Sequence, residues 1–205
     1  MWFRSLFDSV LARTSRTPAR QKGRVSKARR RPGSFRPRLD ILEDRTLPST
    51  FTVTNLLDTG AGSLRAAVSA ANANPGADVI DFTTTGTITL TSGELDITDS
   101  LTINGPGASA LAVSGAGVSR VFGINGDPTV VIAGLTVANG STTDSPGGGI
   151  SMAGGNLTLD HVTVSGNYAV GAPGGYDSSY TVYSVGDGVG GGLYVASGTL
   201  TFEVP

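Results

Sequence analysis

Short stretches of alternating apolar and polar residues recur along most of this chain, and they predict short β-strands. From Asp78 onward we expect them at 79–82, 87–90, 95–98, 101–104, 111–114, 121–124, 130–132, 135–138, 157–159, 162–164, 192–195 and 200–202. One earlier strand is predicted at 51–54. Turn-forming residues separate most neighbouring strands, and no helical pattern intervenes. This spacing indicates a sandwich, a barrel or a parallel β-helix.

An internal repeat favours the β-helix. Residues 190–203, GGGLYVASGTLTFE, lie 43 residues after residues 147–160, GGGISMAGGNLTLD, and half of the aligned positions are identical. We interpret this offset as two coils of about 21–22 residues each. The phrases at 101–104, 135–139 and 162–167 recur as if they were stacked, and Asn-Gly hairpin turns are not systematic. We therefore predict an all-β fold, a right-handed parallel β-helix (solenoid).

One amphipathic helix is predicted ahead of the coils. Ser63 can cap it by accepting a backbone N–H, and Asn74-Pro75-Gly76 ends it. The apolar residues between these signals fall on one face at the spacing i, i+3, i+4 and i+7: Leu64, Ala67, Val68 and Ala71. A solenoid needs terminal caps, so we expect this short N-terminal helix to cover the open end of the first coil.

The distribution of charge divides the chain sharply near Pro48. Residues 1–45 hold thirteen Lys/Arg and four acids, a net charge of +9, whereas residues 46–205 hold two Arg and twelve acids, a net charge of −10. The basic segment has little apolar patterning. We expect 1–50 to be a disordered basic leader, 51–77 to form the strand and capping helix, and 78–205 to form the coils, with a loop insertion at 168–189.

Three interpretations of the basic segment remain open: an unusual export leader, a solvated tail, and a nucleic-acid arm. Basic runs neutralise phosphates, but no aromatic residue lies within the run at 20–31, so we expect no nucleic-acid partner. No apolar run approaches the roughly 18 residues of a membrane helix, so no transmembrane segment is expected. Cysteine is absent from the chain, which excludes disulfides and thiolate metal sites.

Two N-terminal motifs resemble parts of exported bacterial proteins. Residues 39–49, LDILEDRTLPS, resemble the L-E-x-L-E-D-R-x-L-P-S leader of large surface proteins, which implies export. Residues 52–72, TVTNLLDTGAGSLRAAVSAAN, are similar to the CSLREA domain, which precedes repeat regions in secreted bacterial proteins. Ser63, Leu64, Arg65 and Ala67 match that motif, while Gly62 and Ala66 replace its Cys and Glu.

The glycine-rich phrases resemble the repeats of polymorphic outer-membrane proteins, whose hallmarks are G-G-A-I and F-x-x-N. Gly148, Gly149, Ile150 and Asn167 match; Gly replaces Ala, and Val164 stands where Phe is usual. The resemblance implies a pectin-lyase-like right-handed β-helix in a secreted or surface-displayed, often adhesive, protein. Because the chain stops inside an expected strand pair, we expect a truncated member that self-associates through an uncapped C-terminal end.

The sequence contains only some of the catalytic residues that enzymes with a pectin-lyase-like β-helix use. Lyases on this scaffold use clustered carboxylates with Ca²⁺ and a basic residue; here the last Lys is Lys27, and within the solenoid only Arg120 could act as the base. A hydrolase needs two carboxylates about 5–9.5 Å apart, which stacked acids could supply. We interpret Asp78, Asp81, Asp96, Asp99 and Asp160 as solvated acids beside outward-facing positions, and the single histidine, His161, as part of a turn with Asp160. We expect no metal or other cofactor.

One segment suggests recognition. Residues 168–189 hold four of the five tyrosines of the chain: Tyr168, Tyr176, Tyr180 and Tyr183. Solenoid insertions map to loops on one face, often the binding face, and tyrosine offers a large contact area at low entropic cost. These four are the candidate binding residues; a flexible low-complexity loop is the alternative. We expect a non-enzymatic, exported, adhesin-like or surface protein that binds glycans or proteins, with a carbohydrate-active enzyme as the alternative.

Overall fold

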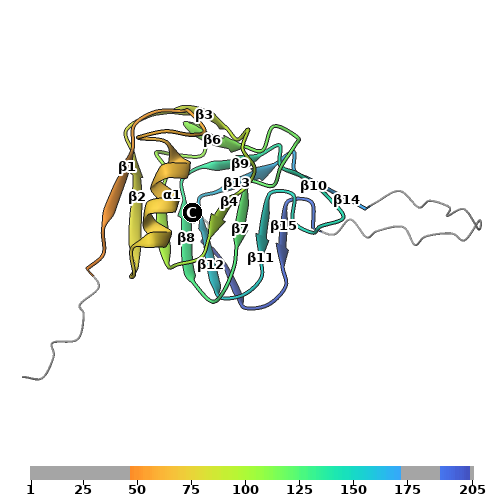
Figure 1. The fold of residues 1–205 in the computed structure, drawn as a ribbon. Helices are drawn as coiled ribbons and strands as arrows, with labels where there is room; N and C mark the ends of the chain where they lie inside the picture. Colours follow the sequence, from red (N-terminus) through yellow and green to blue (C-terminus); the bar gives the residue numbers. More distant parts are fainter. Residues whose placement is uncertain (1–46, 172–189, 204–205) are drawn as a thin grey trace, which may run out of the picture. The chain divides into compact units, whose positions relative to one another are not determined.

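A computed structural model describes residues 47–171 and 190–203, and parallel strands dominate it (Figure 1). The first sheet has the order β1-β2-β5-β8-β12-β16, with bounds Thr50–Val53, Asp78–Phe82, Leu101–Asn104, Thr129–Ala133, Asn156–Asp160 and Thr199–Glu203. The second sheet contains β3 (Gly86–Thr89), β6 (Leu111–Ser114), β9 (Thr136–Ala138) and β13 (Thr163–Ser165). The third contains β4 (Leu95–Ile97), β7 (Phe122–Ile124), β11 (Ile150–Met152) and β15 (Leu193–Val195).

The chain visits the three sheets in turn and winds into a solenoid of about four turns. Each strand pairs in parallel with the strand one coil away, as β5 does with β2 and β8. An additional two-stranded parallel sheet, β10 (Ser141–Thr143) with β14 (Tyr168–Val170), lies at the corner between the second and third sheets. The predicted parallel β-helix is therefore confirmed.

The core consists of columns of apolar side chains that run through successive coils. In the first sheet, Ile80, Ile103, Ile132 and Leu159 occupy one register position, and all are buried. Phe202 continues this column in β16 but is 60% exposed. Successive side chains of a strand point to opposite faces of the sheet. The column forms because the register places an inward-facing apolar residue of each strand opposite one of the next.

The 43-residue repeat is one coil, and our interpretation of it as two coils was wrong. Leu157 pairs directly with Leu200, and Ile150 pairs directly with Leu193. By contrast, Val130 pairs with Leu157, only 27 residues later. The fourth coil is longer because residues 172–189, which lie outside the described part, are inserted between β14 and β15.

The phrases expected to stack do so only in part. Residues 136–138 and 163–165 are paired in the second sheet, with Val137 opposite Val164. Residues 101–104 belong to the first sheet and pair with β2 and β8 instead. Similar local sequences occur in different sheets because each sheet demands the same alternation of apolar and polar side chains.

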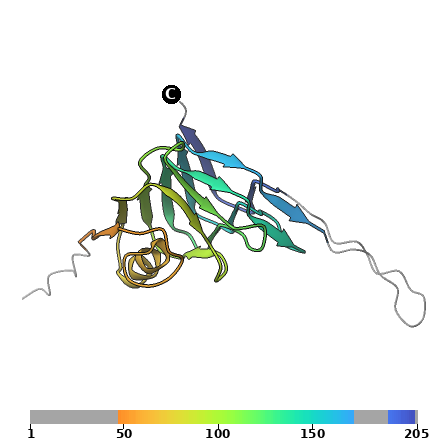
Figure 2. The same ribbon diagram turned by 90° about the horizontal axis from the view of Figure 1, so that it is seen from above.

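The predicted helix is present as α1 (Leu64–Ala73), and its four predicted apolar residues are buried. The Ser63 side chain accepts a hydrogen bond from the Ala66 N–H, which satisfies one free donor of the first turn. Asn74 ends the helix. The helix packs against β1, β2 and β4, the first strands of the solenoid, and Figure 2 shows it end-on at that end of the stack.

Polar side chains of the cap also cover the exposed edge of β4. The Asn72 side chain donates to the Asp96 carbonyl and accepts from the Thr98 N–H, as a neighbouring strand would. Arg65 donates to the carbonyl oxygens of Gly93 and Glu94. An unpaired strand edge invites association with other chains, so these contacts close the sheet where it begins.

Asp58 joins the segment before the helix to the first coil. Its carboxylate accepts from Arg65 Nε and Nη2, and from Thr91 and the Ser92 N–H. Burial raises the pKa of Asp58, but the hydrogen bonds from Arg65, Ser92 and Thr91 lower it further than burial raises it. The net result is a pKa of about 2.

Three strands were not predicted: β10, β11 and β14. β14 occupies the first residues of the segment expected to be a loop insertion. The alignment of Ile150 with Leu193 and of Met152 with Val195 was a usable signal for β11, because β15 was predicted from the same phrase. Within residues 47–171 and 190–203, no helix has the length and apolar character needed to cross a membrane.

Candidate functional site

Tyr168 is the one predicted binding residue that the structure places. It begins β14, and it is 64% exposed. Tyr176, Tyr180 and Tyr183 lie outside the described residues. Tyr168 is opposite Ser141 of β10, so the short β10/β14 sheet carries the tyrosine at a corner of the solenoid.

The Asn139–Gly140 and Gly166–Asn167 turns position this short sheet. Asn139 and Gly166 both adopt positive φ, which turns the chain out of the second sheet. The Asn167 side chain accepts from the Gly140 N–H at 2.7 Å and donates to the Val137 carbonyl at 3.0 Å. These two hydrogen bonds connect the corners of neighbouring coils and hold β14 beside β10.

The glycines at 148 and 149 and Asn167 have structural roles in this corner. A Cβ atom on Gly148 would lie 2.0 Å from the Tyr168 carbonyl oxygen, and one on Gly149 would lie 2.4 Å from the Gly192 carbonyl oxygen. Only glycine permits backbones to approach this closely. The close backbone contacts explain why glycine stands at 148 and 149, and the two hydrogen bonds explain why asparagine stands at 167. No bound ligand is needed to explain these residue types.

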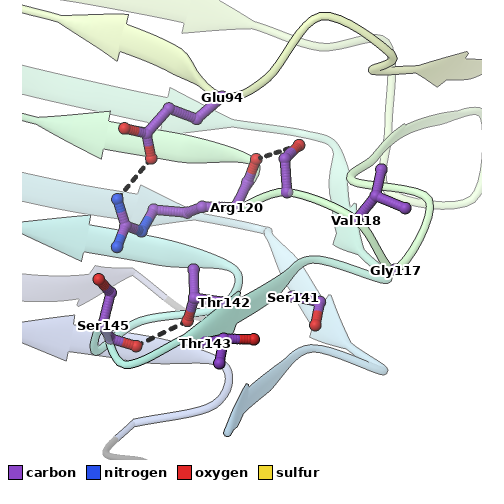
Figure 3. A pocket seen from close by; sticks show the side chains of 9 residues that line it. Glu94, Gly117, Val118, Arg120, Ser141, Thr142, Thr143 and Ser145 are labelled. Carbon is purple, nitrogen blue, oxygen red and sulfur yellow. Dashed lines mark hydrogen bonds and ion pairs between the residues drawn. The ribbon is translucent and has the colours of Figure 1, made fainter. Parts of the chain in front are cut away.

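A hollow of about 540 Å³ lies beside the short sheet (Figure 3). Hydroxyl side chains supply much of its lining: Ser119, Ser141, Thr142, Thr143 and Ser145. The Thr142 hydroxyl donates to the Ser145 carbonyl at 2.7 Å, which shapes the turn after β10. The sequence carries no signal for these residues, since isolated Ser and Thr are common in solenoid turns.

Arg120 and Glu94 are the charged residues among those that line the hollow. They form an ion pair, seen in Figure 3, and Arg120 also donates to the carbonyl oxygens of Gly147 and Pro146. The Arg120 side chain is 15% exposed. The arginine is thus engaged on each of its three nitrogens, and the paired charges leave the hollow close to neutral.

A second hollow of about 340 Å³ adjoins the first, because Gly117 lines both. Tyr168 and Asn139 contribute to its wall. Val118, next to Gly117, is 74% exposed, and Val170 in β14 is 51% exposed. We call the two hollows with Val118, Tyr168 and Val170 the corner face. It combines apolar and aromatic contacts with hydroxyl groups and carries no unpaired charge among its lining residues.

Acids meet at a different place, the end of β12 and β16. Asp160 is opposite Glu203 on the neighbouring coil, and the Asp160 carboxylate contacts the ring of His161, which has a φ of 52°. A groove of about 490 Å³ lies beside these residues and is lined in part by Phe202. The pairing of Asp160 with His161 at a bend agrees with their interpretation as a turn.

The structure corrects one of the predicted solvated acids. Asp78 occupies the inward register position that Leu101, Val130 and Leu157 fill in later coils, and it is 1% exposed. The predicted strand began at residue 79, which left Asp78 in the preceding turn, whereas β2 begins at Asp78 and turns its side chain inward. Within the described ranges, no group of three or more His, Cys, Asp or Glu residues could hold a metal ion.

Comparison of the chain with protein-family models and with curated protein sequences finds no match. The geometry of the described residues is therefore the basis for assigning a function.

Proposed function

We propose that this protein is an exported, non-enzymatic β-helix protein that binds a neutral glycan through its corner face. The observation that carries the proposal is the chemistry of that face: hydroxyl groups line a hollow whose charges are paired, and an exposed tyrosine lines the adjoining hollow. Hydroxyl and carbonyl groups exchange hydrogen bonds with sugar hydroxyls, and an aromatic ring packs on the apolar face of a sugar. An acidic polysaccharide would need a free cation.

The hydrogen bonds and ion pairs of the two arginines, Arg65 and Arg120, also support a binding role over a catalytic one. Arg120 is the solenoid arginine that a lyase mechanism could use as its base, and its three nitrogens are held by Glu94 and two carbonyl oxygens. Arg65 is held by Asp58 and two further carbonyl oxygens. A proton acceptor must be able to reach the substrate proton, and neither group has that freedom.

Export and surface display are supported by the leader-like sequence at 39–49 and by the glycine-rich repeats. A fusion of residues 1–50 to an alkaline phosphatase that is active only after export would test this part. We expect phosphatase activity from the fusion. Activity no higher than that of a leaderless control would contradict export.

Binding can be tested by calorimetry with two probes, the neutral glucan laminarin and the acidic polymer polygalacturonate. We expect the protein to bind laminarin and not polygalacturonate, and we expect Tyr168→Ala to weaken laminarin binding at least fivefold. Leu57→Ala is the matched control, because Leu57 is an exposed apolar residue (66%) on the cap. Equal losses in both variants, or a preference for polygalacturonate, would contradict the assignment of the corner face.

A glycoside hydrolase is the second candidate function, and the stacked pair Asp160 and Glu203 is the observation that favours it. Neighbouring parallel strands lie about 4.8 Å apart, which approaches the carboxylate separation of retaining glycosidases, about 5–5.5 Å. Reducing-end release from neutral and acidic polysaccharides would detect such activity. Activity that disappears in both Asp160→Asn and Glu203→Gln would replace the binding proposal.

A further inference from the structure

Asp78 is a buried carboxylate at the head of an apolar column. It lies at the start of β2 and pairs with Leu101, which is followed in the same column by Val130 and Leu157. Its exposed fraction is 1%. An ionised carboxylate in such surroundings is costly unless it is paired with a cation and fully hydrogen-bonded.

The described partners satisfy only one oxygen of this carboxylate. Asp78 Oδ1 accepts from the Ser49 N–H at 2.8 Å and from Asn74 Nδ2 at 2.8 Å. Asp78 Oδ2 is buried and has no hydrogen-bond partner among the described residues. The two arginines of the described part are paired with other acids, Arg65 with Asp58 and Arg120 with Glu94. Asp78 therefore lacks a counter-ion in this part of the chain.

Ser49 is anchored by every polar group that it has. Its N–H donates to Asp78, its hydroxyl accepts from Asn74 Nδ2 at 3.1 Å, and its carbonyl accepts from the Val79 N–H at 2.9 Å. The two preceding residues, Leu47 and Pro48, are exposed. The sequence also changes here from a segment of net charge +9 to one of net charge −10.

We propose that the Pro48–Ser49 peptide bond is a maturation site, and that the new α-amino group of Ser49 becomes the counter-ion of Asp78. Hydrolysis by a proline-specific peptidase breaks the C–N bond and consumes one water molecule. The carbonyl carbon of Pro48 becomes a carboxylate, and the nitrogen of Ser49 becomes an ammonium group. The nitrogen already lies at hydrogen-bond distance from Asp78, so the charge forms where the buried acid needs it.

Cleavage changes both the number of donors and the charge at this position. The amide nitrogen of Ser49 has one N–H, which Oδ1 of Asp78 accepts, whereas an ammonium group has three. A second N–H can then serve the unsatisfied Oδ2. The ammonium also carries a positive charge, so the contact becomes an ion pair as well as a hydrogen bond. Removal of the basic segment thus tightens the contact between β1, β2 and the capping helix, and the first coil becomes more stable.

The sequence offers a direct probe, because residues 49–205 contain no lysine. The α-amino group of Ser49 would be the only amine in that part after cleavage. We would replace residues 45–48 of the full chain by Ile-Glu-Gly-Arg, so that factor Xa releases an N-terminus at Ser49. N-hydroxysuccinimide acetate would then be applied to the folded product and to a synthetic peptide of residues 49–58, and mass spectrometry would follow acetylation of the amine.

We expect the Ser49 amine of the folded protein to react at least tenfold more slowly than the amine of the peptide. Cleavage should also raise the Tm by about 5 °C, a shift that reflects one new buried ion pair in a domain of this size. Asp78→Asn should remove both effects. Because that variant can fail to fold, a second variant carries one Gly inserted before Ser49, which moves the amine away from Asp78 and should likewise abolish protection and the gain in Tm.

Three results would overturn the proposal. The first is an amine that reacts as fast in the folded protein as in the peptide. The second is an unchanged Tm after cleavage, or an equal gain in the variant with the inserted Gly. The third is an N-terminus other than Ser49 on the processed protein recovered from its native host.

Discussion

The Asp58 carboxylate offers a quantitative test of how the cap is attached to the solenoid. It accepts two hydrogen bonds from Arg65 and others from Thr91 and Ser92, at distances of 2.8–3.1 Å. The Asp58 side chain is 7% exposed. Substitution by Asn keeps the size of the side chain but removes its charge and one acceptor oxygen. Either Arg65, which now donates to Oδ1, or the backbone N–H groups of the first coil, which donate to Oδ2, then lose their partner.

The magnitude follows from the pKa of Asp58. Folding lowers this pKa from 3.8 to about 2, and each unit corresponds to about 1.4 kcal/mol. The ionised form therefore adds about 2 kcal/mol to the free energy of unfolding at neutral pH. Because the folded pKa is the lower one, this contribution is complete above pH 4 and is lost as the pH falls toward 2.

The assay is urea unfolding of the full chain, followed by circular dichroism at several pH values. We expect Asp58→Asn to unfold at lower urea than the wild-type protein at pH 7, and we expect the difference between the two to shrink by about 2 kcal/mol between pH 7 and pH 2. Asp127→Asn is the control, because Asp127 is exposed in the turn before β8. A difference between wild type and Asp58→Asn that is the same at pH 7 and pH 2 would refute the reasoning.

Three further predictions concern packing. Val68→Asp should destabilise the protein by about 3 kcal/mol, because an unpaired charge would enter the interface between α1 and the first coil; an unchanged Tm would show that the helix is not docked. Asn167→Ala should cost about 2 kcal/mol in chemical unfolding, since the Gly140 N–H loses its acceptor; a neutral effect would contradict the corner geometry. Gly148→Ala should lower the Tm much more than Gly192→Ala, because its Cβ would meet backbone at 2.0 Å, whereas that of Gly192 meets only a side chain at 3.2 Å.

The local pattern of the sequence was enough to locate most elements. Leu64, Ala67, Val68 and Ala71 define one helix face whatever lies beneath it, and Ser63 caps the helix through a contact three residues away. Strands such as Leu101–Asn104 and Leu111–Ser114 were predicted with the observed bounds, because alternation is a property of adjacent residues. Their spacing alone left a sandwich, a barrel and a parallel β-helix open; the internal repeat, the recurring phrases and the lack of systematic Asn-Gly hairpins favoured the parallel coils.

The tertiary structure alone decided which residues meet between coils. Whether Leu157 lies one coil or two from Leu200 depends on the length of the connection between them, which alternation does not encode. Likewise, the ion pair between Arg120 and Glu94 joins residues that are distant in the sequence. The burial of Asp78 depends on the register that turns this acid inward. Tyr168 could be named from composition, but its neighbours in the corner face could not, since a solenoid brings turns of different coils together only through the register of its sheets.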